Sequence, residues 1–181
     1  AQKPAVTEAF EKYAKENRII CRDYDEIADF LETYDYKGKV FLDERNSNYT
    51  LFKIVSSRTG HVAGDNPTEG MKAVKNETEL SEMEEVYRKD SAAVIKFIYW
   101  LKKNIGKIEI TELSAARYLD DLRRNTEGFL DLSFPTISAY KDSAAMMHYE
   151  ATEESHKTLA PEGMLLVDSG GQYLGGTTDV T

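Results

Sequence analysis

The last seventeen residues hold the pattern that most constrains how this chain can fold. An apolar run ends in Asp168, four glycines follow, and a second carboxylate, Asp179, stands in a β-branched run. The glycines form two pairs, placed almost symmetrically about a centre between Tyr173 and Leu174. Glycine tolerates the positive φ angles that chain reversal requires. The spacing therefore predicts a β-hairpin with the two carboxylates directly opposite each other on one face.

Two ionised carboxylates side by side repel each other, so such a pair needs compensation. The two acids could share one proton, or they could hold a pair of hard divalent cations, which carboxylate oxygens suit. With metals, a bound water becomes a nucleophile at neutral pH. Both aspartates could also be turn residues that cap loop amides. The spacing alone does not choose between these interpretations.

Two helices are predicted before this hairpin. Asn76 and Glu79 have the spacing of a capping box, and apolar residues recur with helical periodicity over 80–101. Thr111 is expected to cap the second helix. Arg123 and Arg124 fall in its last turn, where the helix dipole favours basic side chains.

Short helical and extended patterns alternate over the first 66 residues, with helices expected at 6–14, 24–34 and 48–57 and strands at 19–21, 39–42 and 61–62. Further strands are expected at 129–134, 164–168 and 177–181. Cys21 follows two isoleucines and is expected to be buried. Turn-forming residues gather at Gly64-Asp65-Asn66-Pro67, which predicts a domain boundary between 1–66 and 67–181.

Composition excludes several classes of function. The 181 residues carry a net charge of −9, which argues against binding of nucleic acid through its phosphates. We found no apolar run of the length that crosses a membrane, so no membrane partner is expected. Cys21 is the single cysteine, which excludes an internal disulfide and fits a cytoplasmic protein.

Four segments, in order, carry a resemblance to a known family. They are PTEGMKAVKNE at 67–77, LSFPTIS at 132–138, His148-Tyr149, and the stretch from LVDSG at 166–170 to GTTDVT at 176–181. Together they resemble aminopeptidase P, the Xaa-Pro aminopeptidases among the pita-bread metallopeptidases. The likeness is strongest over 67–181.

The resemblance implies roles for particular residues. Members of the family use five metal ligands, and here Asp168 would chelate one ion and Asp179 would bridge both. His148 would stand outside the metal ligands and hydrogen-bond the substrate near the scissile bond. The two ions would be manganese, or alternatively zinc or cobalt. The substrates would be peptides with proline in the second position, and the parent enzyme would be a homodimer.

The resemblance also implies the fold and its extent. We expect an α+β chain in which 1–66 forms the C-terminal part of a creatinase-like N-terminal α/β domain. Residues 67–181 would then form the first half of the pita-bread catalytic domain. In the family, a histidine and two glutamate ligands follow at later positions than Thr181. We therefore expect the chain by itself to retain no metal and to be inactive, although its parent is an enzyme.

Two alternatives stay open at this point. One is a prolidase or a creatinase-like hydrolase of the same fold. The other is a metal-free pita-bread protein that binds peptides or proteins. The LSFPTIS segment at 132–138 and His148-Tyr149 favour aminopeptidase P, and the presence of both Asp168 and Asp179 argues against a metal-free protein.

Overall fold

The computed structural model describes residues 6–181. Contacts divide the chain into two compact units, Ala1–Val74 and Lys75–Thr181. The residues expected to form a linker begin a helix instead, because Asn66 caps α4 (Pro67–Ala73) with its side chain. The domain boundary expected after residue 66 stays a prediction.

The first unit places helices around a short parallel sheet. Its described helices are α1 (Glu8–Glu16), the 3-10 helix η2 (Tyr24–Glu26), α2 (Ile27–Thr33), α3 (Tyr49–Arg58) and α4. Strand β1 (Val40–Leu42) pairs in parallel with β2 (His61–Ala63), and α3 makes the crossover between them. The expected α/β alternation is therefore confirmed here.

The strand expected at 19–21 is wrong. These residues lie in an irregular segment, and no strand of the described chain pairs with them. Cys21 is exposed, and so is Ile20. An apolar run alone cannot form a strand, because the backbone hydrogen bonds of a strand need a partner.

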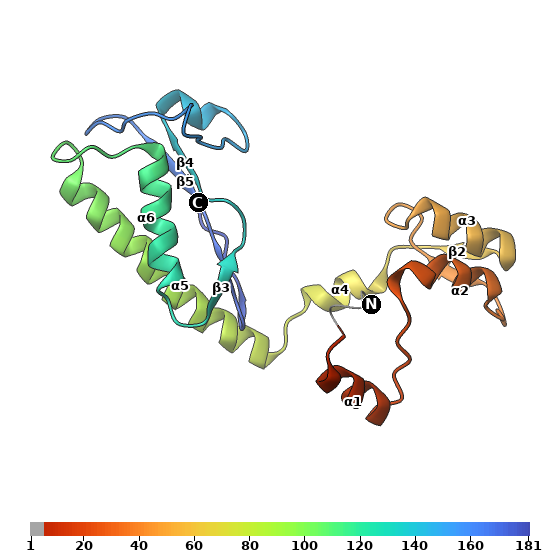
Figure 1. The fold of residues 1–181 in the computed structure, drawn as a ribbon. Helices are drawn as coiled ribbons and strands as arrows, with labels where there is room; N and C mark the ends of the chain where they lie inside the picture. Colours follow the sequence, from red (N-terminus) through yellow and green to blue (C-terminus); the bar gives the residue numbers. More distant parts are fainter. Residues whose placement is uncertain (1–5) are drawn as a thin grey trace. The chain divides into compact units, whose positions relative to one another are not determined.

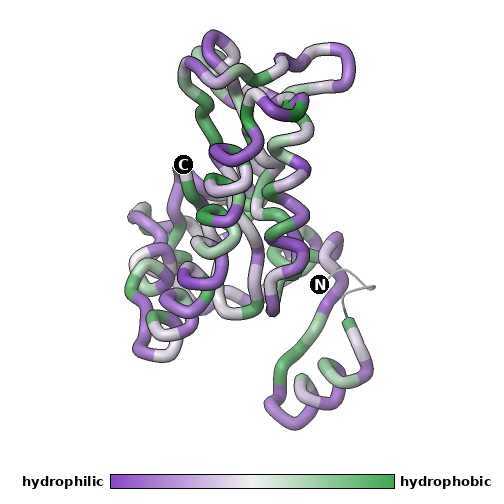
Figure 2. Tube along the Cα trace, turned by 90° about the vertical axis from the view of Figure 1, so that its left-hand side faces the viewer, coloured by the Kyte–Doolittle hydropathy of each residue, from purple (hydrophilic) through white to green (hydrophobic). Residues whose placement is uncertain are grey.

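Two long helices dominate the second unit, and both begin at the predicted residues. Helix α5 (Glu77–Asn104) starts with a capping box between Asn76 and Glu79. Helix α6 (Glu112–Arg124) starts with one between Thr111 and Ser114. Each box satisfies amide donors that a helix start leaves without partners. Figure 2 shows hydrophilic and hydrophobic residues alternating along the helical turns, as amphipathic helices require.

Two small antiparallel sheets complete this unit. Strand β4 (Ile137–Tyr140) pairs with β5 (Leu165–Asp168). Strand β3 (Phe129–Leu132) pairs with β6 (Gly171–Tyr173), which pairs with β7 (Gly176–Thr177). The 3-10 helix η3 (Lys141–Ala145) follows β4. Figure 1 shows α5 and α6 side by side along the strands, with β4 and β5 adjacent.

The core of the unit lies between the helices and the β4–β5 sheet. Its buried members are Phe97, Ile110, Ala115, Leu119, Tyr140 and Leu159. Trp100 packs against this cluster and stacks on Tyr118 with ring centroids 3.9 Å apart. This core fixes β4 and β5 against α5 and α6, and so fixes the residues at the ends of these strands. None of the described helices combines the length and apolar character of a transmembrane span.

Candidate functional site

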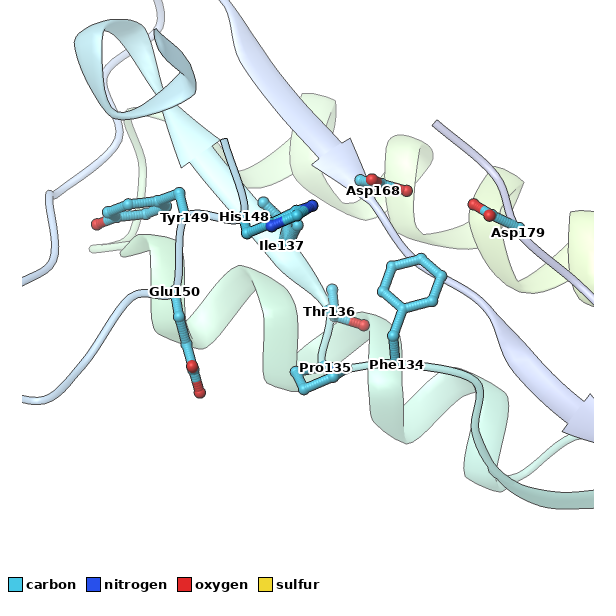
Figure 3. A pocket seen from close by; sticks show the side chains of 9 residues that line it. All are labelled: Phe134, Pro135, Thr136, Ile137, His148, Tyr149, Glu150, Asp168 and Asp179. Carbon is cyan, nitrogen blue, oxygen red and sulfur yellow. The ribbon is translucent and has the colours of Figure 1, made fainter. Parts of the chain in front are cut away.

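One cavity of about 420 Å³ in the second unit is lined by all three residues singled out in the sequence, His148, Asp168 and Asp179. Figure 3 shows the carboxylates of Asp168 and Asp179 pointing toward one another, with the His148 ring extending toward them. The other lining residues are Phe134, Pro135, Thr136, Ile137, Tyr149 and Glu150. The fold therefore brings together residues that are up to 45 positions apart, Phe134 and Asp179.

The hairpin is present, but its register differs from the expected one. Gln172 faces Thr177 and Tyr173 faces Gly176, so the centre lies one residue later than predicted. Ser169 and Val180 then exchange backbone hydrogen bonds of 3.0 and 2.9 Å. Asp168 consequently lies opposite the end of the chain, and Asp179 is its diagonal neighbour. Diagonal neighbours still share one face of an antiparallel pair, so the carboxylates still meet.

Asp168 is held by its neighbours on both sides. It is the last residue of β5, and its partner across the ladder is Ile137 of β4. On the hairpin side, the Thr181 hydroxyl donates a 3.0 Å hydrogen bond to Asp168 Oδ1. Asp168 is half-buried, whereas Asp179 is exposed. The first carboxylate thus has a fixed direction, and the second one faces the open side of the cavity.

The segment before Asp179 is held by a close backbone approach. A Cβ atom at Gly170 would overlap the carbonyl oxygen of Thr178 and the hydroxyl of Ser133. In the space this glycine leaves, Ser133 Oγ donates to Thr178 O at 3.0 Å, and Ser133 N donates to Gly170 O at 3.1 Å. The described glycines with positive φ are Gly60, Gly106, Gly128 and Gly163, none of them in the hairpin. Gly170 therefore serves close packing and not chain reversal.

A buried ion pair anchors the hairpin to the two helices. Arg123 of α6 contacts both carboxylate oxygens of Asp90 of α5, at 2.8 and 3.0 Å. The Tyr173 hydroxyl of β6 donates to Asp90 Oδ1 at 2.8 Å. Burial, and next the hydrogen bond to Asp90, raise the pKa of Tyr173 and keep its proton in place. Arg123 lies in the last turn of α6, as predicted, and its side chain is in addition fully buried.

His148 enters the cavity from the connection between β4 and β5. Its φ is 55°, in the left-handed region that residues with a side chain seldom adopt. No described residue makes a hydrogen bond to its ring, and the residue is exposed. The next residue is firmly tied, because the Tyr149 hydroxyl donates to Glu112 Oε2 at 2.7 Å. The residue next to His148 is therefore tied by its side chain to the first residue of α6.

The opposite wall is tied to α6. Thr136 Oγ1 donates to Asp120 Oδ1 at 2.6 Å, which fixes the 134–137 segment against the helix. Burial raises the pKa of Asp120 above its ordinary value, and this hydrogen bond from Thr136 opposes the rise. Phe134, Pro135 and Ile137 make this wall apolar.

The electrostatics of the cavity favour a cation. Its described lining contains the acidic residues Glu150, Asp168 and Asp179 but no lysine or arginine. Two facing carboxylates without a basic neighbour gain most from a hard divalent ion, whose charge offsets their repulsion. The carboxylate oxygens are therefore of the type that such ions prefer, but the ligands in this chain are too few to hold two ions. No group of three or more candidate metal ligands occurs among the described residues.

Comparison with known protein families agrees with this geometry. Residues 81–181 match the family model described as metallopeptidase family M24, which is more than half of the chain. Residues 1–79 match the creatinase/prolidase N-terminal domain. The chain belongs to metallopeptidase family M24. The expected fold class is thereby confirmed: an α+β chain with creatinase-like N-terminal sequence, followed by the first part of the M24 pita-bread domain.

Individual M24 relatives are similar along nearly the whole chain. Xaa-Pro aminopeptidase 2 of Mus musculus is 37% identical over 88% of the chain, and a probable Xaa-Pro aminopeptidase P of Pyricularia oryzae is 34% identical over 97%. The chain spans 24% and 31% of these relatives' lengths. An X-prolyl aminopeptidase of Caenorhabditis elegans, described as cytosolic with a di-nuclear active site, superposes with a TM-score of 0.91 at 27% identity. That superposition covers 98% of this chain and 30% of the other.

Sequence reasoning missed the buried residues that hold the elements around this cavity in place. Asp90, Glu112 and Arg123 are all fully buried, although each looks like an ordinary surface residue of an amphipathic helix. Asp90 and Arg123 lie 33 positions apart, so the sequence gives no local sign that they pair. The sequence singles out Ser133 only as a member of the LSFPTIS segment at 132–138. The roles of His148, Asp168 and Asp179 stay predictions.

Proposed function

We propose that the protein to which this chain belongs hydrolyses the bond between an N-terminal residue and proline, with two divalent metal ions. The observation that carries the proposal is the meeting of Asp168 and Asp179 in one cavity with His148 beside them. The similarity to Xaa-Pro aminopeptidases along the chain supports the substrate class. The chain supplies the first part of such a site.

Metal chemistry follows from the two carboxylates. Asp168 and Asp179 are the residues of this chain that would hold the ions. When bound, such a pair of ions supplies a water nucleophile at neutral pH and stabilises developing negative charge. We infer manganese as the ion, with zinc or cobalt as alternatives, because carboxylate oxygens suit manganese well. The di-nuclear active site attributed to the C. elegans relative supports the number of ions.

The remaining residues of the cavity would bind and orient the peptide. The His148 ring extends toward the carboxylates and would hydrogen-bond the substrate beside the scissile bond. Phe134, Pro135 and Ile137 offer an apolar wall to the substrate. One oxygen of the Asp168 carboxylate accepts a hydrogen bond from the Thr181 hydroxyl, and Asp168 makes no other side-chain hydrogen bond to a described residue.

We further propose a cytoplasmic, homodimeric enzyme that acts on peptides and not on nucleic acid or membranes. The cytosolic character attributed to the C. elegans relative supports the compartment. The net charge of −9 disfavours contact with phosphate-rich surfaces. The 181-residue chain alone would not retain the ions, because two carboxylates are fewer ligands than a tight site needs.

The experiment uses the full-length protein loaded with manganese. Release of the first residue from an Xaa-Pro-Xaa tripeptide is compared with an Xaa-Ala-Xaa peptide and an Xaa-Pro dipeptide, together with metal content by elemental analysis. We expect cleavage of the first peptide and its loss in Asp179→Asn. The matched control is Asp131→Asn, an exposed aspartate of β3 outside the cavity, which should retain metal and activity.

Each other outcome identifies a different function. Cleavage confined to the dipeptide would indicate a prolidase. A metal-loaded protein that cleaves none of these peptides would favour a creatinase-like hydrolase with another substrate. A wild-type protein that binds no divalent metal would exclude every metallohydrolase in the family and leave a peptide-binding protein.

A further inference from the structure

The buried carboxylate of Glu112 contacts the segment that connects β4 to β5 and contains His148. It is the first residue of α6, and its side chain is fully buried. Its oxygen Oε1 accepts from the backbone N–H of Tyr140 at 2.6 Å. Its other oxygen, Oε2, accepts from the Tyr149 hydroxyl at 2.7 Å and from the backbone N–H of Lys157 at 2.8 Å. One side chain thus ties three separate points of the connection.

These three points are spread along the chain from the end of β4 toward β5. Tyr140 is the last residue of β4, Tyr149 directly follows His148, and Lys157 begins the return toward β5. The backbone of Glu112 also takes part, because its N–H donates to Lys157 O at 2.9 Å. The connection is therefore fastened to the start of α6.

The Glu112 carboxylate is charged in this arrangement. Burial raises its pKa, but hydrogen bonds from Tyr149, from the backbone of Tyr140 and Lys157, and from Ser143 together bring it below the ordinary value. Donors directed at an ionised carboxylate make stronger hydrogen bonds than donors to a neutral group. The anchor therefore depends on an acceptor-only side chain at this position.

His148 depends on this anchor because it has little support of its own. Its φ of 55° is unfavourable for a residue with a side chain, so the surrounding structure must impose it. No described residue makes a hydrogen bond to its ring. The fixed neighbour, Tyr149, therefore sets the direction of the His148 side chain.

We propose that Glu112 is a positioning residue, which holds the His148-Tyr149 turn so that the His148 ring stays beside Asp168 and Asp179. Glu112 lies outside the cavity lining and has no direct part in chemistry. The catalytic consequence rests on the proposed function, but the anchoring itself does not. A displacement of about 1 Å at a reacting group can cost roughly a hundredfold in rate.

The decisive variants are Glu112→Gln and Tyr149→Phe in the full-length, manganese-loaded protein. Glutamine keeps the size of the side chain, but whichever way its amide faces, the NH2 group meets a backbone N–H, that of Tyr140 or that of Lys157, and cannot accept from it. Tyr149→Phe removes only the hydroxyl that ties the turn to Glu112. We expect kcat per bound metal to fall about tenfold to a hundredfold in each variant, with little change in KM or metal content. The double variant should lose less than the product of the two single effects, because both substitutions weaken the same anchor.

A matched control is available in the same connection. Asp142 forms an exposed ion pair with Lys157 and makes no described contact with Glu112. Asp142→Asn therefore removes a charge and an ion pair of the Lys157 side chain, while each hydrogen bond of Glu112 keeps both of its partners. Its kcat, KM and metal content should stay at the wild-type values.

Hydrogen exchange of the 145–150 amides separates this proposal from the proposed function. Faster exchange in Glu112→Gln and Tyr149→Phe, with wild-type exchange in Asp142→Asn, supports the anchor even if the wild type cleaves no Xaa-Pro peptide. If Glu112→Gln does not fold, Tyr149→Phe decides alone. Wild-type exchange and wild-type kcat in Tyr149→Phe would overturn the proposal, as would a loss of kcat that only follows a loss of bound metal.

Discussion

Arg123 and Asp90 form a two-point ion pair in which both side chains are fully buried, with nitrogen–oxygen distances of 2.8 and 3.0 Å. Removing one partner leaves the other charge buried without compensation, which costs about 3–5 kcal/mol. We therefore predict that Arg123→Ala strongly lowers the melting temperature of the full-length protein, or prevents soluble expression. Differential scanning calorimetry measures the effect.

The neighbouring residue gives the control for this prediction. Arg124 also pairs with an aspartate, Asp121, at 2.9 Å, but both side chains are more than half exposed. An exposed pair contributes no more than about 1 kcal/mol. Arg124→Ala should thus melt close to the wild type. Equal effects of the two substitutions would contradict the importance of burial here.

The Tyr173 hydroxyl gives the second prediction. Tyr173→Phe removes its 2.8 Å hydrogen bond to the buried Asp90 carboxylate while keeping the ring packed against Phe129. Hydrogen bonds to charged groups contribute about 1.5–3 kcal/mol, so the melting temperature should fall measurably, by a few degrees. Tyr99→Phe, at an exposed position of α5, is the control and should change stability by less than about 0.5 kcal/mol.

How far the sequence predicts this molecule depends on whether the relevant contacts are local. The starts of α5 and α6 were predictable because each cap is a bond between residues three positions apart, such as Asn76 and Glu79. The hairpin was predictable as an element, but its register was not. Its register is set by contacts with distant residues, such as the hydrogen bond from Ser133 to Thr178.

The supporting residues of the site were not predictable for the same reason. Asp90 and Glu112 stand on helices where acidic residues usually face water. Their burial follows from partners 33 and 37 positions away, Arg123 and Tyr149. Asp168 and Asp179 were singled out by the local spacing of the hairpin, whereas His148 was found only because it belongs to a segment that resembles a family.

Gly170 gives the third prediction. In Gly170→Ala the added methyl group overlaps the Thr178 carbonyl, and a backbone atom can move only if the hairpin shifts. Such overpacking costs about 1–3 kcal/mol or more, and the shift would displace Asp179 from its place beside Asp168. We expect a lower melting temperature together with a reduced manganese content by elemental analysis.

Gly176 tests whether this sensitivity is specific. It lies in the same hairpin, but the nearest atoms to an added Cβ, both in Met83, are 3.9 and 4.0 Å away. Gly176→Ala should therefore keep both stability and metal content. Loss of metal in both variants would mean that the hairpin tolerates no added side chain, for reasons other than the contact with Thr178.

The pH dependence of stability gives the fourth prediction. It rests on two acidic residues, Glu112 and Asp120, whose pKa values are shifted in opposite directions by folding. The Glu112 pKa is lowered in the folded protein, because the donors around it outweigh burial, so its stabilising contribution is present above the ordinary value of 4.5 and is lost as pH falls through the folded value. Burial raises the pKa of Asp120, so its contribution is present below the ordinary value of 3.8 and is lost as pH rises through the folded value.

Substitution of Glu112 and substitution of Asp120 should therefore have opposite effects on how steeply the melting temperature falls in acid. Glu112→Gln lowers the melting temperature at neutral pH, and its difference from the wild type should shrink on acidification below about pH 4.5. Asp120→Asn removes a group that gains stability on acidification, so its loss of stability in acid should be steeper than that of the wild type. Melting temperatures of the three full-length proteins between about pH 3 and pH 7 test both signs. A difference between Glu112→Gln and the wild type that stays constant across this range would contradict an ionised Glu112 in the fold.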